Sequence, residues 1–214
     1  MCTRYYIEPE ASFQELFENV KRSKLVERMR NHYAKPFKTS GEIFPTDLVP
    51  VIAPNPHGEA KVYPMIFGFK MPGTAKPLLN ARSETAGEKP TFSKSWERQR
   101  CIIPASYYFE WEHLISASGD KKIGDKYMIQ PAGETDTWLC GLYRIENGFP
   151  HFVILTKDPK EELKWLHDRM PVILPKGCVQ EWVDPSKDPK KMKERFLAEM
   201  VWEKWVNVRM EEKS

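Results

Sequence analysis

The sequence predicts a single α+β domain over residues 1–214, with a mostly antiparallel sheet that curls toward a barrel and is flanked by helices. Short strand-like apolar runs recur along most of the chain, while helical patterns are confined to a few segments. The 18 prolines favour short elements joined by irregular backbone. No internal repeat, low-complexity segment or linker divides the 214 residues, a length that suits one large domain.

The N-terminal elements are a strand and a long helix. Residues 1–8 alternate weakly and predict a strand that buries the start of the chain. Residues 11–32 place their apolar side chains on one helical face, and Ser12 with Glu15 forms a plausible capping box. We interpret the basic residues of this segment as a solvated helix face.

The central part of the chain is dominated by strands. Residues 48–53 and 61–66 predict a strand pair joined by a turn at 55–58. Residues 92–98 predict a short helix capped by Thr91. The remaining strand-like runs are 100–105, 107–111, 127–129, 138–143, 152–155 and 172–174, with a turn region at 114–124.

Two helices and a last strand are expected toward the C-terminus. Pro159 suits the first turn of a helix that continues through Leu166 and is broken by 167–171. Residues 187–200 have an amphipathic helical pattern, and 201–210 alternate as the final strand.

Composition excludes several classes of protein. No run approaches the ~20 apolar residues of a membrane span, and the N-terminus lacks a signal-peptide pattern, so we expect a cytoplasmic or nucleoid-associated protein without a membrane partner. The net charge of +3 permits a basic groove for nucleic acid without requiring one. The sequence indicates no oligomer, and we expect a monomer.

Cysteine and histidine spacing indicates no disulfide framework and no metal site. The 4 cysteines form no CxxC pair, and the 5 histidines show no metal-ligand spacing. Cys101 and Cys140 lie in apolar strand-like runs and are expected to be buried thiols. We therefore expect neither a metal nor another cofactor.

Cys2 is the first candidate for chemistry. If Met1 is removed, Cys2 presents a free α-amine and a thiol on adjacent carbons, a pair that no internal cysteine can offer. The amine titrates near pH ~8 and the thiol adds a softer nucleophile, so together they can convert an aldehyde into an imine and then a thiazolidine ring. The alternative is that Cys2 is an ordinary residue of a frayed terminus.

Asn80 and Arg82 lie in the polar segment 80–85, directly after an apolar pair. An asparagine amide can orient an amine or a carbonyl, and an arginine can hold a phosphate through two hydrogen bonds. The alternative is a local asparagine turn followed by a surface arginine.

Glu110 is flanked by aromatic residues on a predicted strand. Partial desolvation there would raise the pKa of its carboxyl group and suit it to general acid–base catalysis. Alternatively, Glu110 and Glu112 share a water-facing side of the strand.

His167 ends a predicted helix just before Arg169 and Pro171. A histidine there can shuttle protons near neutral pH. The alternative is a structural role, in which its side chain interacts with the helix dipole.

These fragments, taken in order, resemble the SOS-response-associated peptidase (SRAP) family of abasic-site processing proteins. The matching motifs are Met-Cys-x-Arg at the N-terminus, Asn-Ala-Arg-x-Glu-Thr at 80–85, Tyr-Phe-Glu-Trp at 108–111 and His-x-Arg-Met-Pro at 167–171. The resemblance extends from Cys2 to about Val183.

The resemblance implies a covalent thiazolidine crosslink between Cys2 and the aldehyde of an abasic site in single-stranded DNA. It implies that Asn80 holds the amine or the sugar, that Glu110 transfers protons, and that His167 acts in sugar ring opening and crosslink reversal. Phosphates would be bound by Arg4, Arg82 and Arg169. Bases would stack on Phe67, Phe69 and Trp111.

The chain departs from the family pattern at three positions. Thr3 replaces the usual glycine after the cysteine, and Phe67-Gly68 stands where Trp-Gly is common. Phe109 precedes the glutamate in place of tyrosine. None of these changes removes a proposed catalytic group.

Two other functions remain open from the sequence. Cys2 could serve as the N-terminal nucleophile of a thiol peptidase, including one that removes its own Met1. The protein could also bind single-stranded or modified DNA without covalent chemistry, with Cys2 incidental.

Overall fold

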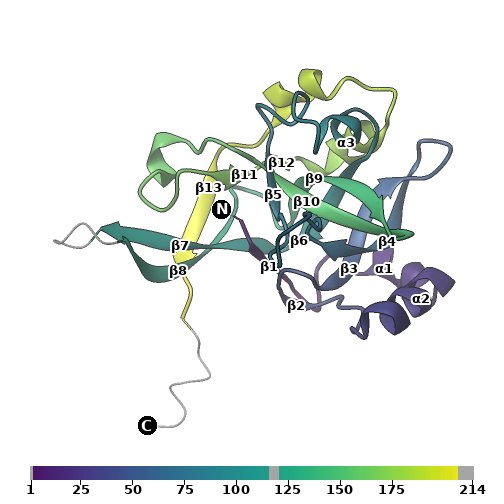
Figure 1. The fold of residues 1–214 in the computed structure, drawn as a ribbon. Coiled ribbons are helices and arrows are strands. Elements are labelled where there is room, and N and C mark those ends of the chain that lie inside the picture. The colour runs from purple at the N-terminus through teal and green to yellow at the C-terminus, as the bar shows by residue number, and fades with distance from the viewer. Residues whose placement is uncertain (1, 116–120, 207–214) are drawn as a thin grey trace, which may run out of the picture.

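The structure is a computed structural model that describes residues 2–115 and 121–206. It confirms the α+β class, with strands predominating (Figure 1). The helices are α1 (Glu15–Lys21), α2 (Lys24–Tyr33), α3 (Ser93–Arg98) and α4 (Val179–Val183), with short 3₁₀ turns η1 (Glu161–Leu163), η2 (Lys176–Cys178) and η3 (Pro189–Arg195). The strands are β1 (Arg4–Ile7), β2 (Gly41–Ile43), β3 (Leu48–Pro54), β4 (Ala60–Phe67), β5 (Asn80–Arg82), β6 (Arg100–Ala105), β7 (Tyr107–Ile115), β8 (Lys121–Pro131), β9 (Thr137–Glu146), β10 (Phe149–Lys157), β11 (Met170–Pro171), β12 (Ile173–Leu174) and β13 (Met200–Lys204).

Five strands close into a barrel. Antiparallel pairing links β4 to β3, β3 to β6, β6 to β9 and β9 to β10, and a parallel pairing of β10 with β4 completes the ring. Gly141 on β9 permits this closure, because a Cβ there would lie 2.7 Å from the Val153 carbonyl oxygen and 2.6 Å from the Ile103 side chain. The predicted barrel-like, mostly antiparallel sheet is therefore confirmed.

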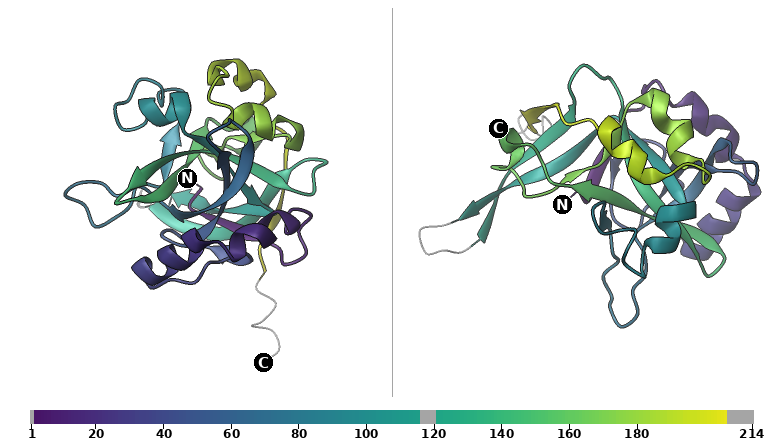
Figure 2. Two further views of the ribbon diagram at one scale, coloured as in Figure 1. Left: turned by 90° about the vertical axis from the view of Figure 1, so that its right-hand side faces the viewer. Right: turned by 90° about the horizontal axis from the view of Figure 1, so that it is seen from above.

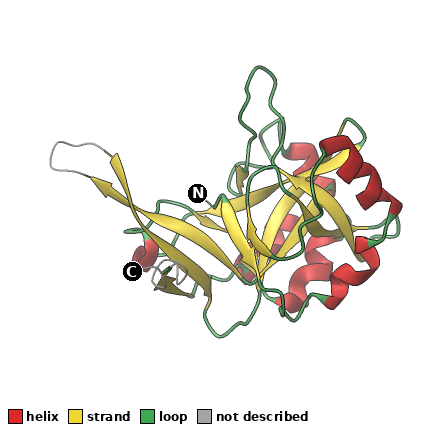
Figure 3. Cartoon of the chain, turned by 90° about the horizontal axis from the view of Figure 1, so that it is seen from below, coloured by secondary structure: helices red, strands yellow, loops and turns green. Residues whose placement is uncertain are grey.

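A second sheet has the order β13-β8-β7-β1-β2 and is antiparallel throughout. Its strands β7 and β8 form a long hairpin that extends away from the barrel (Figures 2 and 3). Strand β1 lies between β2 and β7, so the N-terminal segment is held inside the sheet. The strand predicted within residues 1–8 is confirmed for Arg4–Ile7, and Cys2 before it is buried; Met1 lies outside the described residues.

In the described residues, helices α1 to α4 pack against strands of the barrel. Helices α1 and α2 contact β4, and α4 contacts β6, β3 and β4 (Figure 1). Buried apolar side chains from both sheets join in one main core. None of the helices in residues 2–115 and 121–206 has the length and apolar character needed to cross a membrane.

The strand predictions were mostly correct, including the pair β3–β4 and its turn. Gly58 donates its N–H to the Asn55 carbonyl oxygen at 2.9 Å, and the Asn55 side chain accepts from His57 N–H at 2.9 Å. The predicted turn at 114–124 is narrower, because β7 runs to Ile115 and β8 begins at Lys121; residues 116–120 lie outside the described residues. The last strand ends at Lys204, and residues 207–210 also lie outside them.

The helix predictions need correction. The segment 11–32 forms two helices, because Ser23 is extended and caps α2 by accepting from Val26 N–H at 3.2 Å. The predicted capping box is wrong, since Ser12 donates to Asp136 at 2.5 Å and Gln14 is the N-cap residue of α1. Likewise Thr91 does not cap α3, whose N-cap residue is Phe92.

The two C-terminal helices are only 3₁₀ turns. Segment 159–166 contains η1, and its buried Leu163 and Leu166 are held against the core by successive turns. Segment 187–200 contains η3 and then becomes extended, because Leu197 donates its N–H to Ile173 on β12. Pairing with the sheet outweighs the local helical pattern in this segment.

Candidate active site

Cys2 is fully buried and fixed through its backbone. Its carbonyl oxygen accepts a hydrogen bond from the Asn80 side-chain amide at 2.9 Å, and its thiol lies 3.8 Å from the Arg4 carbonyl oxygen. Burial raises the pKa of the Cys2 thiol far above its ordinary range, and the nearby Glu110 carboxylate adds to the rise. The thiol is therefore neutral in this environment.

Asn80 begins β5, which pairs in parallel with β10 opposite Ile154. Its side-chain amide is buried and spans from Cys2 to the Ile154 carbonyl oxygen, which is 3.5 Å away. The alternative of a local asparagine turn is wrong, because this side chain bonds a segment 78 residues away.

Glu110 lies on the inward face of β7. Its side chain is 5% exposed and shares that face with Tyr108, whereas Glu112 beyond it is partly exposed. Desolvation raises the pKa of the Glu110 carboxyl group, as predicted. The alternative, in which Glu110 and Glu112 both face water, is wrong. A register shift between Trp111 and His113 helps to separate the environments of the two glutamates.

His167 and Glu110 line the same small cavity. Its volume of about 10 Å³ has room for about one water molecule. The His167 ring also lies 4.3 Å from the His113 ring, measured between centroids. Desolvation, with the charge of His113 as a further cause, lowers the pKa of His167 to about 4.

With this lowered pKa, His167 is neutral at pH 7, and its role in proton transfer stays a prediction. The His167 Nδ1 atom lies 3.1 Å from the Arg169 backbone nitrogen. Asp168 lies 2.6 Å from the same nitrogen, but its side chain is 80% exposed and its charge is screened by water. The alternative, in which His167 interacts with the dipole of a helix that it ends, is wrong, because the short turn η1 already ends at Leu163.

A surface cleft of about 470 Å³ adjoins this cavity. Arg82, His113 and Trp165 line the cleft, while His167 and Arg169 line both the cleft and the cavity. The exposed Arg82 side chain makes the mouth basic. His167 thus lies between the surface cleft and the small cavity that Glu110 lines.

The Arg169 guanidinium group is occupied by hydrogen bonds within the protein, so the prediction that Arg169 binds a phosphate is wrong. Its guanidinium group donates to Glu84 at 2.7 Å, to the Thr156 carbonyl oxygen at 2.9 Å and to Asp158. The side chain is only 7% exposed. We assign it to the wall of the site.

Phe67 and Phe69 cannot stack on bases, because both are fully buried. Phe67 stacks on Phe152 with ring centroids 5.0 Å apart, and Phe69 packs against Arg144 and Phe92. The corresponding prediction is wrong.

Arg4 and Trp111 lie on the opposite face of the second sheet from Glu110. The Arg4 guanidinium group is 5.7 Å from the Trp111 ring centroid and 4.0 Å from that of Phe44. Lys126, paired with Trp111 on the adjacent strand, completes this group. Arg4 is therefore near Cys2 in sequence but separated from the cleft by the sheet.

Sequence reasoning missed four residues of these surfaces. They are Phe44, His113, Lys126 and Trp165. No local motif marks them, since they come together through strand pairing and through the loop after η1. The exposure of Trp165, at 42%, is visible only in the folded chain.

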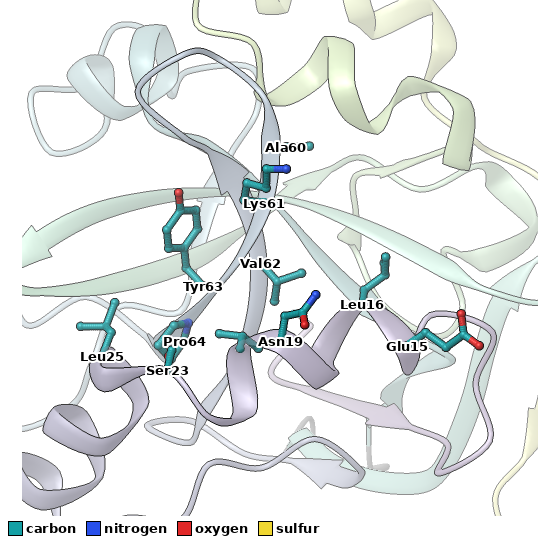
Figure 4. A pocket seen from close by; sticks show the side chains of 11 residues that line it. Glu15, Leu16, Asn19, Ser23, Leu25, Ala60, Lys61, Val62, Tyr63 and Pro64 are labelled. Carbon is teal, nitrogen blue, oxygen red and sulfur yellow. The ribbon is translucent and has the colours of Figure 1, made fainter.

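A different pocket, of about 640 Å³, lies between α1, the start of α2 and β4 (Figure 4). Leu16, Val62 and Tyr63 are among its lining residues, and none of the candidate catalytic side chains reaches it. Within residues 2–115 and 121–206, no group of three or more His, Cys, Asp or Glu side chains is arranged to hold a metal ion.

Comparison with solved structures supports the fold. A crystal structure of a protein from Bacteroides thetaiotaomicron matches with a TM-score of 0.69 at 21% identity, covering 100% of this chain and 95% of that one. A phage-related protein from Bordetella bronchiseptica also matches with a TM-score of 0.69 at 21% identity, covering 95% and 94%.

Comparison with curated sequences gives closer relationships over part of the chain. The chain is 37% identical over 114 residues to the abasic site processing protein YoaM of Bacillus subtilis, covering 51% of this chain and 48% of YoaM. It is 32% identical over 126 residues to the abasic site processing protein YedK of Escherichia coli, covering 56% and 54%. The chain thus spans about half the length of the curated relatives it matches.

The family comparison covers nearly the whole sequence. The model of the SOS response associated peptidase (SRAP) family matches residues 1–212, a range that includes Cys2, Asn80, Glu110 and His167. The chain therefore belongs to the SOS response associated peptidase family.

Proposed function

We propose that this protein processes abasic sites in single-stranded DNA by forming a thiazolidine crosslink through Cys2 after Met1 has been removed. The observation that carries the proposal is that Cys2 before β1, Asn80 on β5 and Glu110 on β7 lie close together in the fold. The Asn80 side chain donates to the Cys2 carbonyl oxygen at 2.9 Å, and Glu110 lies close enough to Cys2 to contribute to the raised pKa of its thiol. The names of the curated relatives support the same lesion as substrate.

The chemistry requires one aldehyde and both nucleophiles of Cys2. The α-amine nitrogen attacks C1′ of the ring-opened sugar, and the resulting carbinolamine loses water to give an imine. The sulfur then adds to the imine carbon while the thiol proton is transferred, through a base, to the nitrogen. One water is released overall, and no oxidant or reductant is needed.

Glu110 is suited to the proton transfers. Because desolvation raises its pKa, the carboxyl group can donate a proton to the departing water. The neutral His167 ring shares the one-water cavity with Glu110 and reaches the surface cleft. We assign His167 to proton transfer at the sugar during ring opening and during reversal of the crosslink.

The DNA strand would lie along the cleft beside His167. Arg82 at its mouth can bind a phosphate, and the half-exposed Trp165 can stack on a base. Arg4 and Trp111 would contact the strand on the other side of β1 and β7. Trp165 and Trp111 would thus stack on bases, in place of the buried Phe67 and Phe69.

A denaturing gel tests the proposal. Purified protein, with loss of Met1 verified by intact mass, is incubated with a single-stranded oligonucleotide that bears one abasic site. The expected result is a shifted band that survives denaturation and is absent for Cys2→Ala. Cys178→Ala is the matched control, because Cys178 is the more accessible thiol and should be dispensable. No shifted band, or a band retained by Cys2→Ala, would refute the proposal.

The two alternative functions predict different results. A general thiol peptidase would cleave an unrelated peptide and lose that activity in Cys2→Ala, whereas a protein that only forms the crosslink would not cleave the peptide. A non-covalent binder would keep its DNA affinity in Cys2→Ala and give no band with wild type.

A further inference from the structure

A compact cluster of charged and aromatic side chains lies on the face of the second sheet opposite Glu110. We call it the outer-face cluster; it comprises Arg4 on β1, Glu42 on β2, Trp111 on β7, Lys126 on β8, and Phe44 just after β2. Strand pairing brings these residues together, since Trp111 is opposite Lys126, Arg4 is opposite Phe109 on β7, and Glu42 is opposite Tyr6 on β1. The cluster begins two residues from Cys2.

Glu42 links the two cations of the cluster. Its Oε1 accepts from Arg4 at 3.1 Å and from Lys126 at 2.9 Å, and its Oε2 lies 3.0 Å from Lys126. The side chains are 24% exposed for Glu42, 31% for Arg4 and 17% for Lys126. One carboxylate therefore balances two cations, at a place that solvent reaches.

Aromatic rings position the same cations independently of Glu42. The Arg4 guanidinium group lies 4.0 Å from the Phe44 ring centroid, and the Lys126 ammonium group lies 3.5 Å from that of Phe109. Trp111 lies within 5.7 Å of both cations, and Phe44 is 38% exposed. Two fixed cations beside an exposed ring are what a phosphate and its neighbouring base require.

We propose that the outer-face cluster is a phosphate-binding subsite for single-stranded DNA, in which the Glu42 carboxylate takes the place of a phosphate until DNA displaces it. The inference deepens the proposed function and rests on it. A carboxylate and a phosphate accept similar hydrogen bonds from arginine, so they compete for Arg4 and Lys126. Because an incoming phosphate must first displace the Glu42 carboxylate from Arg4 and Lys126, Glu42 weakens the binding of DNA.

The sign of one substitution distinguishes this role from a structural one. Removing the charge in Glu42→Gln frees both cations, so affinity for single-stranded DNA should increase by about 5- to 20-fold. The logarithm of affinity should also fall more steeply with the logarithm of salt concentration, by about 0.7 in slope, because a phosphate would then bind two free cations instead of displacing a carboxylate from them. If Glu42 instead orients Arg4 and Lys126 for DNA, the same substitution weakens binding.

Fluorescence anisotropy with a labelled single-stranded oligonucleotide that lacks any abasic site measures this effect. Glu18→Gln is the control, because Glu18 pairs with Lys21 on α1 and its loss changes the net charge equally. The proposal expects tighter binding for Glu42→Gln and a change below about twofold for Glu18→Gln. Unchanged or weaker binding for a folded Glu42→Gln protein overturns it, as does the absence of binding by both wild type and this variant.

A second pair of variants decides the matter if Glu42→Gln does not fold. Lys126→Met keeps an apolar chain against Phe109 and removes the charge, so DNA affinity should fall at least fivefold, whereas Lys21→Met should change it less than twofold. Equal effects of the two substitutions overturn the proposal. Crosslinking to an abasic oligonucleotide is measured in parallel. If crosslinking fails, the proposed function is refuted, and the DNA-binding measurements still test whether the outer-face cluster binds phosphate.

Discussion

Replacement of Arg169 by methionine tests whether this residue is a structural clamp or a phosphate ligand. Methionine keeps much of the apolar volume but removes every hydrogen bond of the guanidinium group. The buried Thr156 carbonyl oxygen would lose one of its two donors and keep the Ser83 N–H at 2.9 Å, which costs about 1 kcal/mol. The pair with Glu84, 42% exposed, adds about 1 kcal/mol, and the pair with Asp158, 79% exposed, adds little.

We therefore expect Arg169→Met to lower the free energy of unfolding by about 2 kcal/mol, which corresponds to a Tm decrease of roughly 4–8 °C for a chain of this size. Thermal denaturation followed by circular dichroism at pH 7 measures it. Arg82→Met is the matched control, because the exposed Arg82 lines the same cleft and its loss should leave Tm within about 2 °C.

The pH dependence of this difference follows from Glu84. Burial acts to raise the pKa of its carboxyl group, but hydrogen bonds from Arg169 outweigh burial and the pKa is lowered from its ordinary value of 4.5. A lowered carboxyl pKa stabilises the fold above pH 4.5, and the stabilisation is lost as the pH falls through the folded-state value. The difference between wild type and Arg169→Met should thus narrow in acid. An unchanged Tm together with a large loss of DNA affinity would refute the clamp and restore the phosphate role.

Three further predictions concern the site and the barrel. Glu110→Gln should slow crosslinking by about 10²- to 10⁴-fold in a timed gel and, because a raised carboxyl pKa penalises the folded state at high pH, should raise Tm at pH 8; a faster reaction would contradict the acid–base role. Since the pKa of His167 is lowered to about 4, the wild type should lose roughly 1–2 kcal/mol of stability between pH 6.5 and pH 4 in urea titrations, and His167→Gln should flatten that slope. Gly141→Ala should destabilise the barrel by about 1–3 kcal/mol, because the new Cβ would lie 2.7 Å from backbone, whereas Gly177→Ala, which has open space, should be neutral.

The strands were predictable from local sequence, but the closure of the barrel was not. Runs such as β3 and β4 have apolar side chains and turn residues that identify them individually. Closure depends on the parallel pairing of β10 with β4, which joins His151 to Ile66 and leaves no local signal. The helical pattern of 187–200 was misleading for a related reason, because a hydrogen bond from Leu197 to the sheet overrides it.

Individual catalytic candidates were predictable where a motif marks them. Cys2, Asn80 and Glu110 were selected from sequence, and the fold brings them together. The errors came from residues whose environment is set by distant partners. Arg169 is neutralised by Glu84, 85 positions away, and an aromatic residue such as Phe67 gives the same local signal in a core as on a surface.

The burial of Cys2 also determines the order of steps in the proposed chemistry. Desolvation keeps the thiol protonated and favours the neutral form of an amine, so the nitrogen is the active nucleophile and attacks first. The raised pKa of Glu110 favours its protonated form, which can act as the acid, and the group becomes a carboxylate once it has given its proton to the departing water. That carboxylate can then take the proton from the thiol at the moment when the imine carbon is ready to accept sulfur. A single buried carboxyl group thus serves both steps in sequence, whereas an ionised glutamate in water would lack the proton that the first step needs.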